Sequence, residues 1–198
     1  MRLYVELVGW LACAVYSTIP AFWFMIHPFA ERWRARRRSP YRVLLPAWIA
    51  MWAIMGLVTR QWRHISLYLD GWTWIPAACL FAGGFYLYAK SGKSFSAKQL
   101  GGLPELHAGH REQRLATEGI RAHVRHPVYL AHLCEMFAWS IGTGLAVCWA
   151  LTAFAMVTGA AMIRMEDAEL EKRFGDSYRA YRRAVSAVFP RMKASRQI

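Results

Sequence analysis

Two apolar runs meet in residues 128–163, VYLAHLCEMFAWSIGTGLAVCWALTAFAMVTGAAMI. They cover about residues 128–141 and 145–163, and only the turn Gly142-Thr143-Gly144 separates them. Such a short turn places two helices side by side in antiparallel orientation. Runs with so few charges are typical of helices in a lipid bilayer, which need about 20 apolar residues for a crossing. The sequence therefore predicts a helical hairpin in a membrane.

Three further apolar runs precede this hairpin, at about residues 3–26, 43–59 and 71–89. Apolar residues make up 56% of the 198-residue chain, and ten are tryptophans, which is high for a soluble protein of this size. We therefore expect an all-α, polytopic membrane protein with about five transmembrane helices. The first run carries Glu6 and follows almost no basic segment, so it is not expected to be a cleaved signal peptide.

The net charge of +13 would suit a nucleic-acid partner, but the positions of the basic residues argue against one. All of the 25 Lys and Arg residues except Arg2, Arg60 and Arg63 lie in residues 31–42, 90–127 or 164–198. Five crossings place these three segments on one side of the membrane. Because cytoplasmic loops carry the excess of basic residues, the amino terminus is predicted outside and the carboxyl terminus in the cytoplasm, as in a bacterial inner-membrane protein.

The chemistry is expected in residues 90–198, whereas residues 1–89 form a membrane scaffold of three helices. A polar loop of nearly forty residues leads from Lys90 to the hairpin, and loops of that length are usually functional or disordered. After Arg164 the chain is predicted to form one amphipathic cytoplasmic helix, with apolar residues at helical spacing. The basic residues 31–42 are expected to form a solvated loop that determines the topology, with binding of anionic membrane lipids as the alternative.

Arg125, His126 and Tyr129 mark the start of the hairpin. Pro127 suits the first position of a helix, where its missing N–H costs no hydrogen bond. Arg125 and His126 then lie at a helix amino terminus, which favours anions. Tyr129 shares roughly one side of this helix with His126. Arg125 and His126 are accordingly candidates for binding the charged end of a ligand, although three side chains of this kind also occur as plain interfacial residues.

His132 and Glu135 lie deeper in the same apolar run. Ionisable residues inside a membrane segment usually line a cavity, pair with a partner or act in function. The two residues are predicted to partner each other and to remove a proton from an acceptor. In a transport protein the same pair would form a proton or ion relay. Farther along, Glu166 begins the amphipathic helix, where a carboxylate suits the hydroxyls of a ribose.

Several short motifs follow one another from Leu115 to Pro190. They are LATEG at 115–119, VRHPVY at 124–129, the hairpin, the acidic pair Glu166 and Asp167, FGDSYRAYRRAV at 174–185, and Phe189-Pro190. In this order and spacing they resemble the isoprenylcysteine carboxyl methyltransferase superfamily, which also holds phospholipid and small-thiol methyltransferases. The first half of the chain shows no motif of that family.

The resemblance implies that S-adenosylmethionine binds in a cytoplasmic pocket with a lipid-facing entrance, and that its methyl group passes to an amphipathic or lipid-like acceptor. The implied cofactor-binding residues are Leu115, Ala116, His126, Pro127, Val128, Tyr129 and Glu166. The candidate catalytic residues are Arg125, His132, Glu135 and Arg164. Where prenylcysteine enzymes carry an arginine four residues before the first acid, this chain has Met162, so a prenylcysteine carboxylate is not implied.

Three alternatives remain at this stage. Membrane sterol reductases share a similar carboxyl-terminal architecture but use NADPH, and a membrane scaffold or transport protein would use no cofactor at all. A metal site would draw on His107, His110, His123 and His126, but their three-residue spacing is not the i, i+4 spacing of zinc-binding histidines on a helix, no acidic signature accompanies them, and no metal is expected. The four cysteines form no CxxC motif.

Overall fold

The computed structural model describes residues 2–35, 39–92, 106 and 115–190. Most of the predicted long loop, with His107 and His110, lies outside these residues. The described part of the chain is helical, contains no β-strand, and includes two isolated bridges between loop residues. The expected all-α class is therefore confirmed.

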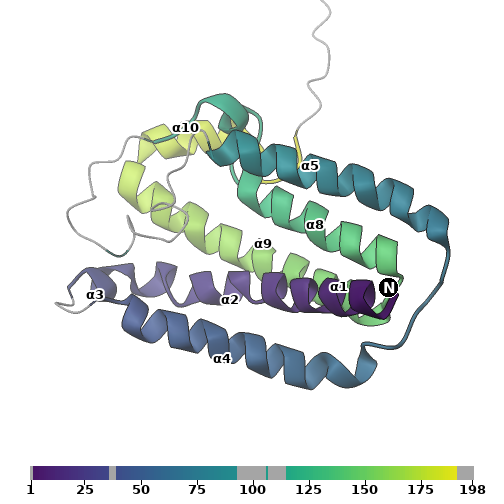
Figure 1. The fold of residues 1–198 in the computed structure, drawn as a ribbon. Helices are drawn as coiled ribbons and strands as arrows, with labels where there is room; N and C mark the ends of the chain where they lie inside the picture. Colours follow the sequence, from purple (N-terminus) through teal and green to yellow (C-terminus); the bar gives the residue numbers. More distant parts are fainter. Residues whose placement is uncertain (1, 36–38, 93–105, 107–114, 191–198) are drawn as a thin grey trace, which may run out of the picture.

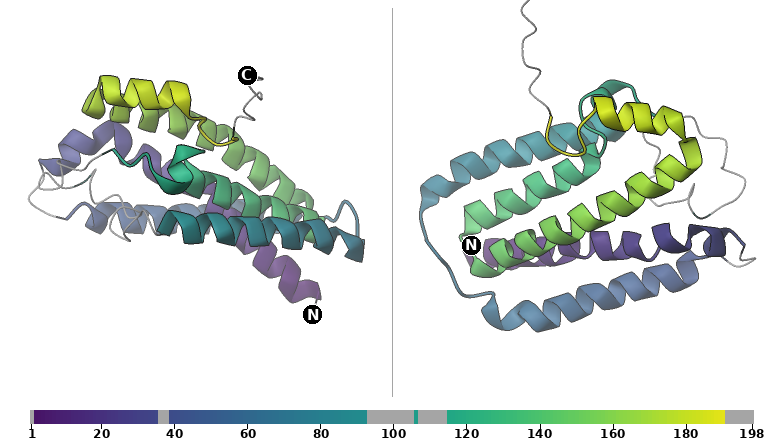
Figure 2. Two further views of the ribbon diagram at one scale, coloured as in Figure 1. Left: turned by 90° about the horizontal axis from the view of Figure 1, so that it is seen from above. Right: turned by 180° about the vertical axis from the view of Figure 1, so that it is seen from behind.

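The long helices form five rods, which lie side by side and run in alternating directions (Figures 1 and 2). The rods are α1 (Arg2–Ser17) with α2 (Ile19–Phe24), which count as one, α4 (Tyr41–Thr59), α5 (Trp74–Gly92), α8 (Pro127–Thr143) and α9 (Ala146–Phe174). At one end lie the short helices α3 (Ala30–Arg34) and α10 (Asp176–Ala184), and we call it the α10 end. The amino terminus and the α8–α9 turn lie at the other end (Figure 1).

Three stretches are long and apolar enough to cross a membrane: Arg2–Trp33, Tyr41–Trp62 and Ala146–Phe174. On α4 only Leu44 and Thr59 are buried, and an apolar face of this helix is exposed. Its members are Val43, Leu45, Ile49, Ile54, Leu57 and Val58. An exposed apolar face of this length is compatible with contact to lipid. Because α5, with 19 residues, and α8, with 17, are not among these three stretches, the five crossings stay a prediction.

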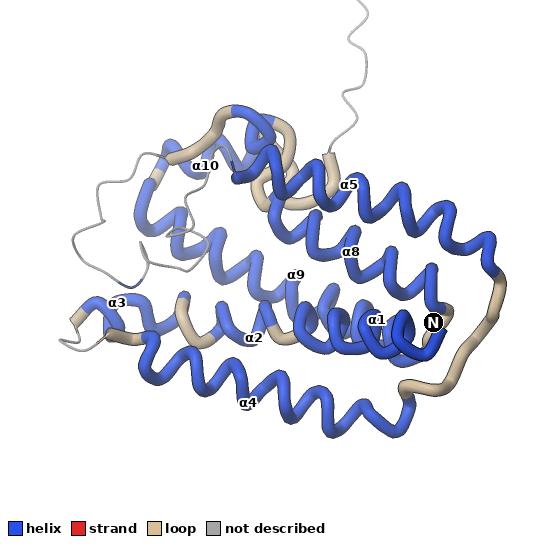
Figure 3. Tube along the Cα trace, in the orientation of Figure 1, coloured by secondary structure: helices blue, strands red, loops and turns tan. Residues whose placement is uncertain are grey.

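The predicted helix boundaries hold at the hairpin and differ elsewhere. As expected, Pro127 opens α8, and Gly144, in the left-handed region, directly follows its last residue, Thr143. Figure 3 shows α8 as one continuous helix. The first apolar run is interrupted between Ser17 and Ile19. The prediction of a single amphipathic helix from Arg164 was wrong. The helix α9 continues to Phe174, and Gly175, with φ +58°, then separates α9 from α10.

The principal core joins both halves of the sequence. Trp10, Cys13 and Ala14 of α1 pack against Met136 of α8 and against buried residues of α9. Polar bonds between helices add to this apolar contact. The Ser140 hydroxyl lies 2.9 Å from the Thr152 hydroxyl, and the Trp10 indole donates to Thr59 at 2.8 Å. Hydrogen bonds of this kind and small side chains are what hold helices together in membranes.

The connection between α4 and α5 is tied to the α8–α9 turn. Leu67 donates its backbone N–H to Gly144 at 2.8 Å, and Ala146 donates to Ile65 at 2.9 Å. A Cβ atom at Gly144 would lie 2.5 Å from the backbone oxygen of Tyr68. Gly144 is therefore required both by its φ of +67° and by the close approach of this connection.

We expect Gly144→Ala to lower the free energy of unfolding by at least about 1 kcal/mol, since a left-handed non-glycine residue costs about 1–2 kcal/mol before any clash. The thermal unfolding midpoint of detergent-purified protein measures this effect. Gly56→Ala on α4 serves as a control, because a Cβ atom there meets nothing within 4 Å. Equal midpoints for the two variants would contradict the assignment.

Candidate functional site

The start of α8 is held by the segment that follows α10. Arg125 donates its backbone N–H to Ser186 at 2.8 Å, and His126 donates to Ala187 at 2.9 Å. Val124 forms a parallel bridge with Ser186. These bonds occupy backbone groups that a helix end would otherwise leave unpaired. They fix Arg125 and His126 at the α10 end before any side chain is considered.

The Arg125 side chain is buried and bonded to protein groups. Its Nη2 donates to Asp167 of α9 at 2.7 Å, and its Nη1 donates to the carbonyls of Arg182, at 3.2 Å, and Val185. A guanidinium can form several such bonds at fixed angles, which suits it to join segments. Arg125 therefore connects α8, α9 and the end of α10.

His126 lies between two carboxylates of α9. Its Nε2 is 3.0 Å from Asp167 Oδ1, and its Nδ1 is 3.3 Å from Glu166 Oε2. Burial by itself would lower the pKa of His126, but the charge of Glu166 and the hydrogen bond to Asp167 outweigh it and raise the pKa to about 9. The raised pKa favours the imidazolium form of His126 at neutral pH, which forms a hydrogen bond with Asp167 through Nε2 and an ion pair with Glu166 through Nδ1.

Asp167 also accepts a hydrogen bond from the Tyr178 hydroxyl of α10. Burial, followed by this bond, raises the pKa of Tyr178 above its usual value. Tyr178, Tyr181 and Val185 form a small apolar cluster, against which Leu115 and Phe174 pack. Tyr181 additionally donates to the carbonyl of Arg121 at 2.7 Å. The cluster places α10 and the segment before α8 against α9.

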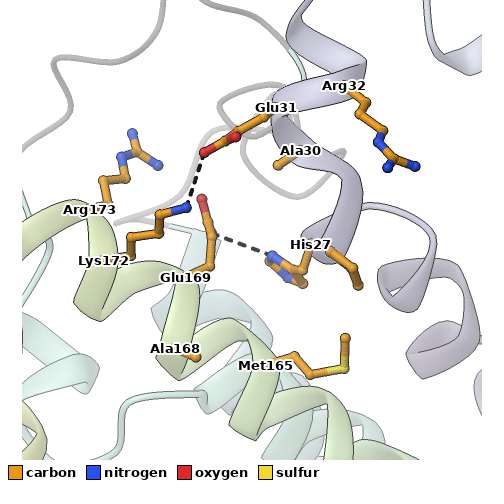
Figure 4. A pocket seen from close by; sticks show the side chains of 10 residues that line it. His27, Ala30, Glu31, Arg32, Met165, Ala168, Glu169, Lys172 and Arg173 are labelled. Carbon is orange, nitrogen blue, oxygen red and sulfur yellow. Dashed lines mark hydrogen bonds and ion pairs between the residues drawn. The ribbon is translucent and has the colours of Figure 1, made fainter.

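A cavity of about 730 Å³ lies at the same end of the bundle, between α9 and the turn formed by η1 (His27–Phe29) and α3 (Figure 4). Its charged lining residues are His27, Glu31, Arg32, Glu169, Lys172 and Arg173. His27 Nδ1 lies 3.5 Å from Glu169, and Lys172 donates to Glu31 at 3.2 Å. Pro28, Ala30, Met165 and Ala168 supply an apolar part of the lining.

The cavity adjoins the His126–Glu166 pair through α9 and His27. Met165 lines the cavity directly before Glu166, and His27 is close enough to Glu166 to interact with its charge. Arg173 contributes two buried guanidinium nitrogens, Nε and Nη2, which have no hydrogen-bond partner among the described residues. One cavity thus contains the Glu169 carboxylate, which is paired with His27, and the Arg173 guanidinium, two of whose nitrogens lack a hydrogen-bond partner among the described residues.

Most of the predicted site residues lie toward the α10 end, whereas His132, Glu135 and Arg164 lie farther along α8 and α9, and the predicted residues do not form one lining. None of them lines the cavity: Pro127 is buried, Leu115 packs against the α10 cluster, and Val128, Tyr129 and Ala116 are half-buried. Arg164 is exposed, and Met162 is fully buried. His132 Nδ1 and Glu135 Oε1 are buried, and neither atom makes a hydrogen bond among the described residues, so the expected pairing of these atoms is not present.

Asp167, His27 and Glu169 were not among the predicted site residues. Asp167 is the centre of the network, and its only signal in the sequence is its position in the acidic pair. His27 and Glu169 carry no motif, because they meet across the bundle from elements far apart in the chain. Within the described residues, no three His, Cys, Asp or Glu side chains are grouped as a metal site.

No protein-family model, no curated protein and no solved structure matches this chain.

We expect the stability of the protein to fall as pH rises from about 6.5 through 9, and His126→Gln to remove much of this dependence. A pKa raised from 6.5 to about 9 stabilises the folded state fully below pH 6.5. The contribution, about 3 kcal/mol at most, is lost as the imidazolium deprotonates in the fold. Unfolding midpoints between pH 6 and 10 measure it. His123→Gln, at an exposed neighbour, is the matched control, and an unchanged pH dependence in His126→Gln would overturn the assignment.

Proposed function

We propose that this protein is an integral membrane methyltransferase. It transfers a methyl group from S-adenosylmethionine to an amphipathic or lipid-like acceptor, as the resemblance of residues 115–190 to the isoprenylcysteine carboxyl methyltransferase superfamily implies. The observation that carries the proposal is the convergence, at one end of an apolar helical bundle, of the buried His126–Glu166 pair and a cavity with charges of both signs.

The cavity is compatible with this cofactor in size and charge. At about 730 Å³ it falls in the range of small-molecule sites. S-adenosylmethionine carries a carboxylate, an ammonium and a sulfonium. The unpartnered nitrogens of Arg173 suit the carboxylate, and Glu31 and Glu169 suit the positive groups. The apolar residues Met165 and Ala168 offer a surface for the adenine ring.

Bound cofactor would supply a methyl group that is activated by its attachment to a positively charged sulfur. The residues of the chain then have to bind, orient and exclude water, because an in-line displacement depends on alignment. Glu166 directly follows the lining residue Met165, and it is the candidate for the ribose hydroxyls of a cofactor that extends beyond the lining. His126 and Asp167 hold α9 so that Glu166 keeps its place. Arg125 serves this proposal as a positioning residue, since its guanidinium is bonded to Asp167 and backbone carbonyls.

The proposed location is the cytoplasmic membrane face, with five helices crossing the bilayer. Support comes from the alternating directions of the five rods in Figure 1 and from the three stretches of sufficient length and apolarity. The basic segments 31–35, 39–42 and 164–190 lie at the α10 end, where the cavity is found (Figure 1). A site at this interface can be reached by a ligand that is dissolved in the bilayer.

NADPH is the competing cofactor, because Arg32, Lys172 and Arg173 at the cavity would also suit phosphate groups. This observation supports the membrane reductase alternative. The two cofactors differ in charge, so binding distinguishes them directly.

We expect detergent-purified protein to bind S-adenosylmethionine and S-adenosylhomocysteine in calorimetric titrations, and Glu166→Gln to weaken both by at least about tenfold. Hydrogen bonds to a charged group contribute about 1.5–3 kcal/mol, which corresponds to that factor. Glu118→Gln, at an exposed position before α8, should bind as the wild type does.

Binding of NADPH without binding of either adenosyl ligand would move the protein to the reductases. If none of the three ligands binds, both the methyltransferase and the reductase proposals are refuted. Unfolding midpoints of both variants, measured in the same buffer, separate weakened binding from loss of the fold.

We expect the two termini to lie on opposite sides of the membrane, because a chain that crosses five times, an odd number, ends on the side opposite to its start. Fusions of a reporter that fluoresces only in the cytoplasm should be bright at the carboxyl terminus and dark at the amino terminus. Equal signals from both fusions would contradict an odd number of crossings.

A further inference from the structure

An aromatic cluster lies inside the bundle, below the start of α8. The ring of His132 is 5.1 Å from Tyr16 of α1, 5.5 Å from Tyr88 of α5 and 6.3 Å from Tyr129 of α8, between centroids. Three helices therefore contribute rings to one place. At a rise of about 1.5 Å per residue, His132 lies about 8 Å along the helix axis from Pro127.

Glu135 lies one turn farther along α8, against α5. Its residue is 4% exposed, and its Oε1 has no hydrogen-bond partner among the described residues. No described lysine or arginine forms an ion pair with it, whereas the other buried acid, Asp167, has Arg125. Its charge is close enough to Tyr16 and Tyr88 for an electrostatic interaction. A buried carboxylate of this kind is costly unless a partner is present.

The unpartnered polar atoms around Glu135 define the chemistry of the missing partner. His132 Nδ1 and the Tyr88 hydroxyl are also buried without a hydrogen bond in the described structure. A carboxylate oxygen, a ring nitrogen and a hydroxyl oxygen all accept hydrogen bonds from a donor. Aromatic faces attract cations and repel anions. The partner that satisfies all these groups is a positively charged donor.

Gly84 of α5 lies next to the Glu135 carboxylate and leaves room for it. A Cβ atom there would lie 2.7 Å from Glu135 Oε1 and 3.3 Å from the Ala131 carbonyl, so a larger residue would have to displace the carboxylate from this position. The α5–α8 pair runs side by side along its length (Figure 1). Gly83, the preceding residue, would meet nothing within 4 Å if it carried a Cβ atom.

The geometry points to a binding site for the ammonium group of an amphipathic amine, formed by Tyr16, Tyr88, His132 and Glu135. The apolar part of the ligand contacts the surrounding helices, as the exposed Phe85 and Tyr86 of α5 offer an apolar approach from the bilayer. A row of rings, His126, Tyr129 and His132, joins this site to the α10 end, with 5.6 Å between the first two centroids. The site does not depend on the proposed reaction, since the ligand binds without a cofactor.

The experiment compares the binding of hexylamine, hexan-1-ol and hexanoate to the full-length protein in one detergent, without S-adenosylmethionine. We expect hexylamine to bind at least about tenfold more tightly than hexan-1-ol, and hexanoate more weakly than either. Glu135→Gln keeps the shape of the side chain and removes its charge, so the preference for the amine should be lost. Equal affinity of the wild type for amine and alcohol would overturn the inference.

Two glycine variants test the site independently of the Glu135 charge. Gly84→Ala displaces the carboxylate and should reduce the preference for the amine at least about fivefold, whereas Gly83→Ala should leave it unchanged. Unfolding midpoints confirm that each variant is folded. An amine preference that survives in both folded Glu135→Gln and folded Gly84→Ala would refute the site. Loss of adenosyl-ligand binding with a retained amine preference would instead refute only the methyltransferase proposal.

Discussion

Asp167 holds the α10 end of the bundle together through one buried carboxylate. It accepts hydrogen bonds from Arg125 and from Tyr178, and it lies 3.0 Å from His126. Since these partners come from the segment before α8 and from α10, a single side chain on α9 joins three parts of the chain. Removal of one partner from such a buried network leaves an unpaired charge, which costs about 3–5 kcal/mol. The positions of Glu166 and of the cavity beside it both depend on this junction.

Neighbouring residues of α9 have different surroundings in the Asp167 network and at the cavity. Asp167 and Arg125 are bonded to protein groups, which suits a structural role. Glu166 and Glu169 face histidines, His126 and His27, that come from the start of α8 and from the end of the first apolar stretch. The lining of the cavity comes from both halves of the sequence, from residues 27–32 and from residues 165–173. A site of this construction changes shape if either half moves.

The bundle contains a second group of polar atoms with a different character. Glu135, His132 and Tyr88 present acceptors in an aromatic surrounding, and none of the described lysine or arginine residues forms an ion pair with Glu135. At the α10 end, by contrast, every described carboxylate on α9 lies near a cationic or histidine side chain. This difference is the reason to assign the interior group to a ligand and the Asp167 network to the fold.

The sequence by itself determined the helical class, the hairpin and the start of α8. Apolar runs, the Gly142-Thr143-Gly144 turn and Pro127 are local features, and local geometry is enough to interpret them. It also marked His126 and Glu166 as candidate site residues, but it did not show that they face each other. Only the tertiary structure decided that Arg125 binds Asp167, that His27 meets Glu169, and that Glu135 faces Gly84 instead of pairing with His132 through its buried Oε1. Some of these contacts join residues that are far apart in the chain, and the others depend on which side of a helix faces its neighbour. Both are determined by how the helices pack against one another.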